Sequence, residues 1–178
     1  GYQIDEVQRA IRDSDFRNIS MCYRGQGINA RDKQFMDRHY EKHAEKHFHC
    51  ATVPTTDRTL TVLYSDVNYF KTQFHKGIKS RADIGGSISL YSPERQSEHL
   101  LLAKHCLAET PEEDVFEKED RRVIMWKNVK EEDNEYFDNF VGCLAGLFKL
   151  GCEIRGKKKK QGTYSIKDYI QKQKEARA

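Results

Sequence analysis

The chain has 178 residues, of which 37% are hydrophobic and 33% charged, and its formal net charge is +3. This length suffices for one domain with a buried core. No apolar run approaches the roughly 20 residues that cross a bilayer, so we expect no membrane partner. The five cysteines are odd in number and lack paired spacing, which favours reduced thiols over a disulfide framework.

The first half of the chain predicts helices alternating with strands, the order typical of an α/β fold. A helix should follow the second strand, capped by Ser65 or Asp66. The expected elements are a helix at 4–14, a strand at 18–23 ending in a glycine turn at 24–27, a strand at 58–64 and a helix at 66–75.

A highly charged segment before the second strand is rich in histidine. Three of its histidines repeat at helical spacing and two further metal-binding side chains follow: His39, His43 and His47, then His49 and Cys50. A zinc site is one interpretation. The spacing matches no standard zinc motif, so we favour a polar surface segment.

The second half of the chain predicts a β-hairpin followed by one long amphipathic helix. The expected elements are a turn and strand at 84–91, a helix at 97–106, the hairpin at 115–129, the long helix at 134–150, a linker at 156–162 and a terminal helix at 164–176.

The helix at 134–150 has two distinct faces. Asn134 is a suitable N-cap. One face is apolar: Phe137, Phe140, Val141, Leu144, Leu147 and Phe148. The other carries two carboxylates one turn apart and then small residues: Glu135, Asp138, Gly142, Ala145 and Gly146. A large partner could approach the acids over this face. On pattern alone we favour a core helix with solvated acids and closely packed glycines, because acid pairs at this spacing are common.

Charge is distributed unevenly along the chain. Residues 109–138 are acidic, and residues 149–177 are basic, with four consecutive lysines at 157–160. A basic flank beside an acidic pocket suits a polyanion that is held by one part and cut by another. A solvated tail is the alternative for the lysine run.

Trp126 and, after a charged loop, Asn134-Glu135-x-x-Asp138-x-Phe140-Val141-x-x-Leu144-Ala145-x-Leu147 form the most distinctive motif. This motif resembles the C-terminal nuclease part of the large terminase subunit of tailed phages, of the lambda (GpA) type. Weaker similarities accompany it in the same order, at residues 1–7, 18–25, 63–74 and 85–90. The resemblance therefore extends over residues 1–150.

The resemblance implies an α/β, RNase H-like mixed sheet flanked by helices, with acidic residues around divalent metals. Two such cations, Mg²⁺ or Mn²⁺, activate a water and stabilise the leaving oxygen of a phosphodiester. The resemblance makes Asp138 the matching metal and catalytic acid. Glu135 would be a second metal ligand and catalytic acid, or it would orient Asp138 without contacting the metal itself. Asp66 is a further metal candidate, for which helix capping is the competing role.

The resemblance also implies biological partners. The complete protein would cut concatemeric double-stranded viral DNA in the host cytoplasm, together with the terminase small subunit and the portal protein of the procapsid. Residues 1–150 would belong to the nuclease domain. Residues 151–178 would form a basic linker and helix that docks on the portal.

Two departures from the family limit what these residues should do alone. Gly1 matches the glycine of an Asp-x-Gly motif, so the nuclease domain is expected to be incomplete at its N-terminus. The phosphate-binding motif of the ATPase part is absent from the sequence. We therefore expect the 178 residues alone to be inactive or nearly so.

A non-catalytic α/β module that binds DNA or protein through the basic tail is the alternative function. Basic side chains elsewhere could contact phosphates, although ordinary surface charge explains each of them: Arg24, Lys33, Lys71, Arg121 and Arg122.

Overall fold

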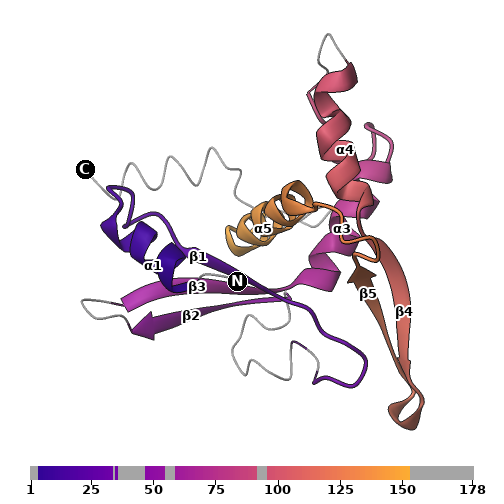
Figure 1. Ribbon diagram of the computed structural model, residues 1–178, viewed down its shortest axis with the longest axis horizontal. Helices are drawn as coiled ribbons and strands as arrows, with labels where there is room; N and C mark the ends of the chain where they lie inside the picture. The colour runs from indigo at the N-terminus through magenta and orange to yellow at the C-terminus, as the bar shows by residue number, and fades with distance from the viewer. Residues whose placement is uncertain (1–3, 34, 36–46, 55–58, 92–95, 153–178) are drawn as a thin grey trace.

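The computed structural model describes residues 4–33, 35, 47–54, 59–91 and 96–152. These residues form a mixed α/β fold with two small sheets (Figure 1). The predicted linker and terminal helix lie outside the described residues, as do His39 and His43. Among the helices that are described, none combines the length and apolarity needed to cross a bilayer.

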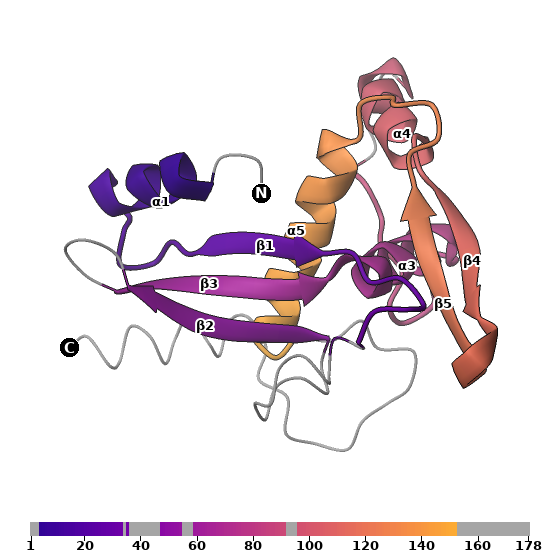
Figure 2. The ribbon, with the colours of Figure 1, turned by 60° about the horizontal axis from the view of Figure 1, so that its bottom comes forward.

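The larger sheet has three strands in the order β1-β3-β2. They are β1 (Cys22–Gln26), β2 (Phe48–Pro54) and β3 (Thr59–Asp66). β3 lies in the centre, parallel to β1 and antiparallel to β2. Because β1 and β3 are parallel, their carboxyl ends lie at the same edge of the sheet, and both point toward the helix that follows β3 (Figure 2).

The smaller sheet is a hairpin, as predicted, but it spans residues 110–127 instead of 115–129. It consists of β4 (Thr110–Phe116) and β5 (Arg121–Lys127), joined through the short 3₁₀ turn η3 (Glu117–Glu119). Asp120 closes the turn in the left-handed region, with φ 46°. The hairpin lies beyond the helix that follows β3, at the end of the molecule opposite α1 (Ile4–Asp13) (Figure 1).

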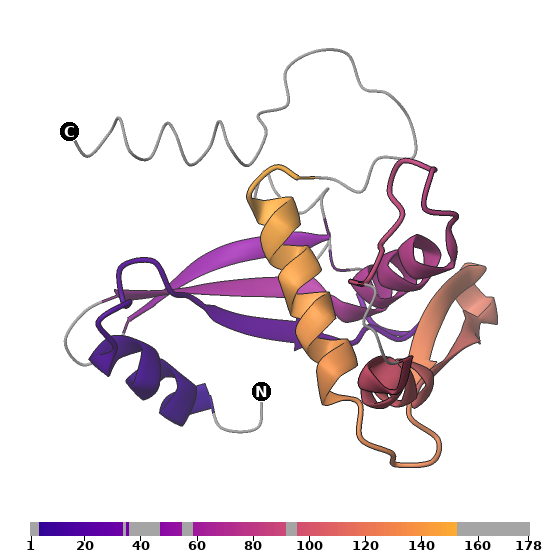
Figure 3. The ribbon, with the colours of Figure 1, turned by 90° about the horizontal axis from the view of Figure 1, so that it is seen from above.

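Three helices surround the junction between the two sheets. They are α3 (Val67–Lys79), α4 (Leu100–Leu107), which continues the 3₁₀ turn η2 (Gln96–His99), and α5 (Glu135–Lys149). α5 crosses one face of the three-stranded sheet and packs against α3 (Figure 3). Most of its predicted apolar stripe forms the core with α3, where Phe70, Phe74, Phe137 and Val141 are almost fully buried, but Leu147 is exposed.

The strand β1 lies further along the chain than predicted. The strand starts at Cys22 instead of residue 18, and it includes Arg24 and Gly25, which were expected to turn. Gly25 is needed for a different reason, because a Cβ at this position would lie 2.3 Å from Cγ2 of Val67. The glycine therefore allows β1 to approach the start of α3 closely.

Two other predictions were wrong. The charged segment before β3 ends in a strand, β2, which pairs with β3 along its whole length and buries Phe48. Residues 84–86 form the predicted turn, but residues 87–91 have no regular secondary structure and do not form the predicted strand. Gly86 has φ 96°, and the amide of Ile88 donates to the carbonyl oxygen of Gly77 at 2.9 Å. This segment therefore packs against α3 and joins no sheet.

Two helical glycines allow a matched test of this packing. A Cβ at Gly77 would lie 2.7 Å from Cδ1 of Ile88, whereas a Cβ at Gly146 would meet nothing within 4 Å. Gly146→Ala should raise the free energy of unfolding by about 0.5–1 kcal/mol through helix propensity. Gly77→Ala should lower it by about 1–3 kcal/mol through overpacking. Urea denaturation measures both changes, and equal effects would contradict the close contact at Gly77.

Candidate functional site

A buried lysine joins two carboxylates from distant parts of the chain. The ammonium of Lys71, on α3, lies 2.5 Å from Oε1 of Glu109 and 2.9 Å from Oδ1 of Asp138. The side chains of Lys71 and Glu109 are only 6% and 4% exposed, whereas that of Asp138 is 52% exposed. The cluster therefore combines a buried ammonium with one buried carboxylate, Glu109, and one that is exposed to solvent, Asp138.

Asn134 fixes the position of the two acids. It occupies the N-cap position of α5, but its side chain makes no capping hydrogen bond. Its amide nitrogen instead donates to Oε1 of Glu109 and, at 3.4 Å, to Oδ2 of Asp138. The predicted N-cap position is confirmed, but the side chain makes no capping hydrogen bond. The residue connects the start of α5 to the segment between α4 and β4.

Lys71 also contacts an aromatic ring, and Glu109 keeps one oxygen unpaired. The ammonium lies 5.2 Å from the centroid of the Phe137 ring. Oε2 of Glu109 is buried and has no hydrogen-bond partner among the described residues. A buried carboxylate oxygen without a partner is costly, so this atom is a ready ligand for a cation or a donor group.

Tyr23 links this cluster to the sheet. Its hydroxyl lies 2.8 Å from Oγ of Ser65, near the carboxyl end of β3. Burial raises the pKa of Tyr23 above its ordinary value, and the negative charges of Asp138 and Asp66 raise it further, against the hydrogen bond with Ser65. Asp138 thus lies within electrostatic range of the edge at which β1 and β3 end.

The small residues of α5 do not leave a continuous open face. A Cβ at Gly142 would lie 3.3 Å from the Tyr23 ring, and Ala145 is fully buried. Tyr23 of the same chain therefore occupies the space next to Gly142. Gly146 alone has open space around it.

The predicted acids have different surroundings. Asp138 belongs to the buried cluster, and Glu135 is exposed on the first turn of α5. Asp66 caps α3 by accepting from the amide of Tyr69 at 3.2 Å, as its competing role predicted, and it lies 3.5 Å from Nδ1 of His47. Among the residues that the structure describes, no three or more His, Cys, Asp or Glu side chains form a group that could hold a metal.

Sequence reasoning missed Glu109 and gave Lys71 only a general role in phosphate contact. Glu109 lies in the short connection between α4 and β4, where no periodic pattern distinguishes it. Lys71 occupies the α3 face that carries Phe70 and Phe74, and a lysine among buried aromatics is the one available signal.

The described residues fit a divalent cation in part. Asp138 and Glu109 supply carboxylate oxygens, which are the ligands that Mg²⁺ prefers, and one oxygen of Glu109 is unpaired. Lys71 already balances part of their charge. A complete two-metal site would therefore need further acids from outside this group.

Comparisons of the chain with models of protein families, with curated proteins and with solved structures give no match.

The Lys71–Glu109 pair should be far more important for stability than an exposed pair. Lys71→Met leaves the buried Glu109 carboxylate without its cation and should cost about 3–5 kcal/mol of unfolding free energy. Lys71→Met combined with Glu109→Gln should recover much of this loss, because no buried charge remains unpaired. Urea denaturation of the unchanged chain and of these variants measures the free energies of unfolding.

Lys127 provides the matched control for these variants. Its ammonium lies 2.6 Å from Oε2 of Glu112, but both side chains are about half exposed. Lys127→Met should therefore have little effect on stability. A Lys71→Met variant as stable as Lys127→Met would contradict a structural role for the buried pair.

The pKa of Tyr23 should report the charge of Asp138. Asp138→Asn removes one of the negative charges that raise this pKa, so the pKa should fall toward the ordinary tyrosine value of 10.0. Because the folded pKa is raised, ionisation of Tyr23 should destabilise the fold as pH rises through about 10 and above. NMR of labelled tyrosine rings measures the pKa. Asp133→Asn is the control, and an unchanged pKa in Asp138→Asn would contradict the proximity of the two groups.

Proposed function

We propose that the chain is a metal-dependent DNA endonuclease domain of a phage packaging terminase, with an RNase H-like fold. The observation that carries the proposal is the convergence of Asp138 and Glu109 on one buried ammonium, beside the edge where β1 and β3 end. Acids gathered at the carboxyl ends of strands are suited to holding cations against a phosphodiester. The motif around Asp138 supplies the family assignment.

Each residue of the cluster has a role in this proposal. Asp138, half exposed, holds a cation where a DNA phosphate can reach it. Glu109 supplies a second carboxylate through its unpaired oxygen. Lys71 keeps the two acids together against their mutual repulsion. When bound, a pair of Mg²⁺ or Mn²⁺ ions would activate a water and stabilise the leaving oxygen.

Tyr23 has a further role in binding. Like any tyrosine hydroxyl, that of Tyr23 is protonated at neutral pH and can donate a hydrogen bond to a phosphate oxygen. Glu135 is exposed on the first turn of α5 and remains available as an additional ligand. Asp66 already caps α3, so we assign it no more than an electrostatic contribution.

The proposal includes components outside the described residues. It includes further acids that complete the two-metal site, and it includes the small subunit, the portal protein and double-stranded viral DNA as partners in the host cytoplasm. The residues at 151–178 would provide the contact with the portal.

A non-catalytic α/β binding module is the second candidate. The observation that favours it is the ammonium of Lys71, which compensates the charge of both carboxylates without any metal. In this interpretation the cluster is purely structural, and binding to DNA or protein is the whole function.

Mn²⁺ titration followed by NMR separates the two candidates. In the nuclease, Mn²⁺ should broaden the amide signals around Asp138, Glu109 and Tyr23 selectively. Asp138→Asn should abolish this broadening, whereas the control Asp133→Asn should preserve it. Broadening that is absent from these residues, or unchanged in Asp138→Asn, would favour the binding module.

Cleavage of plasmid DNA is the second measurement. The 178 residues alone should cut little or nothing in Mg²⁺, because the described acids supply only part of a two-metal site. Efficient Mg²⁺-dependent cutting by these residues alone would refute the need for further acids.

A further inference from the structure

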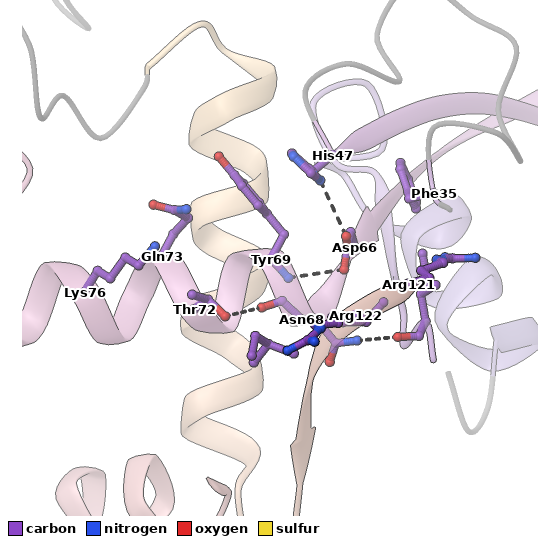
Figure 4. A pocket seen from close by; sticks show the side chains of 13 residues that line it. Phe35, His47, Asp66, Asn68, Tyr69, Thr72, Gln73, Lys76, Arg121 and Arg122 are labelled. Atoms are coloured by element: carbon purple, nitrogen blue, oxygen red, sulfur yellow. Dashed lines mark hydrogen bonds and ion pairs between the residues drawn. The ribbon is translucent and has the colours of Figure 1, made fainter. Parts of the chain in front are cut away.

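A positively charged groove runs between α3 and β5, on the side of α3 away from the buried cluster. One cavity, of about 400 Å³, is lined by Lys76, Arg121 and Arg122, and Asp66 is the only carboxylate among its described lining residues (Figure 4). A second, more open hollow of about 670 Å³ adds Lys79 and Trp126. The two hollows share Thr72, Lys76 and Ile124, so they form one continuous surface, here called the α3–β5 groove.

The cations of the groove are mostly free of internal partners. Lys76 and Lys79 are exposed and have no ion pair among the described residues. Arg122 makes a single long contact, 3.8 Å from Oε1 of Glu113, and both side chains are exposed. Arg121 is held by the carbonyl oxygen of Asp32, and its buried Nε has no hydrogen-bond partner in the described part of the chain. Among the described residues that line the groove, four cations (Lys76, Lys79, Arg121 and Arg122) therefore face one carboxylate, that of Asp66.

The floor of the groove is apolar and aromatic. Trp126 is part-buried and lies 4.4 Å from the His75 ring, centroid to centroid, and its Nε1 donates to Oγ1 of Thr72 at 3.1 Å. Ile124 is 44% exposed. Burial lowers the pKa of His75, so this ring is uncharged at neutral pH. A cationic rim thus surrounds a neutral, partly aromatic floor.

We propose that the α3–β5 groove binds a single strand of nucleic acid, with phosphates on Lys76, Lys79 and Arg122 and with sugars and bases over Ile124 and Trp126. Grooves that bind single strands combine a positively charged rim with aromatic side chains. A duplex presents its phosphates outward and hides its base faces, so it would leave the floor uncovered. From Val67 to Lys79, α3 rises about 18 Å, enough for a few nucleotides.

The inference is independent of cleavage. It depends on the charge and lining of the groove and needs no metal. Its test is therefore done in EDTA, where the proposed nuclease has no cations, so either proposal can fail without the other.

Trp126 provides a direct probe because it is the only tryptophan of the chain. Adding a short oligothymidine single strand should quench the intrinsic tryptophan fluorescence of the full 178-residue chain. The triple variant Lys76→Gln, Lys79→Gln and Arg122→Gln should bind the strand much more weakly, so that quenching needs far more oligonucleotide. Its slope of log affinity against log salt should fall by about two, since each phosphate contact on a single strand contributes about 0.7.

A matched triple variant controls for total charge. Lys104, Lys130 and Lys149 are exposed and line neither hollow, so Lys104→Gln, Lys130→Gln and Lys149→Gln should leave the quenching intact. Circular dichroism should show the same thermal unfolding for both triple variants. Equal quenching in both variants, or binding to the strand without any quenching, would overturn the proposal.

Two further ligands test the identity of the occupant. The same oligonucleotide as a duplex should quench more weakly than the single strand, and a duplex that quenches as strongly would overturn the assignment to single strands. Inorganic phosphate at an equal phosphate concentration should not quench. Quenching by phosphate alone would make the groove a small-anion site and would also overturn the proposal.

Discussion

The ammonium of Lys71 lies between the carboxylates of Glu109 and Asp138, and this shared contact connects α3, the α4–β4 connection and α5. Without this ammonium, the two carboxylates that it contacts would repel each other. The packing of α5 across the sheet therefore depends on a charge balance as well as on the aromatic core. Any function assigned to Asp138 has to begin from this constraint.

α3 separates two environments of opposite charge. One face carries Lys71 and the aromatic residues that pack against α5, beside the acidic pair. The other face presents Thr72 and Lys76 to the hairpin, beside the arginines of β5. A single helix can contribute to both environments because consecutive residues of a helix point in different directions. The acid-bearing site and the basic groove are thus adjacent without neutralising each other.

Local patterns predicted the described helices and the central strand, and they failed where long-range contacts decide the structure. The apolar stripe of α5 and the capping by Asp66 followed from spacing and residue type. The sequence did not predict β2, because this strand follows a highly charged segment and depends on its pairing with β3, which no local sequence pattern shows. The role of Glu109 depends on a partner 38 residues earlier, a separation that no periodicity encodes. Asn134 was assigned to the right position with the wrong hydrogen bonds.

The order of these partners along the chain also sets the order of assembly during translation. Lys71 is synthesised first, Glu109 follows 38 residues later, and Asp138 arrives with the last described helix. At about 5–20 residues per second, the nascent lysine stays hydrated for several seconds before α5 exists. Docking of α5 is consequently the step that removes water from the ammonium, so the nascent chain cannot complete its core before this helix has been made.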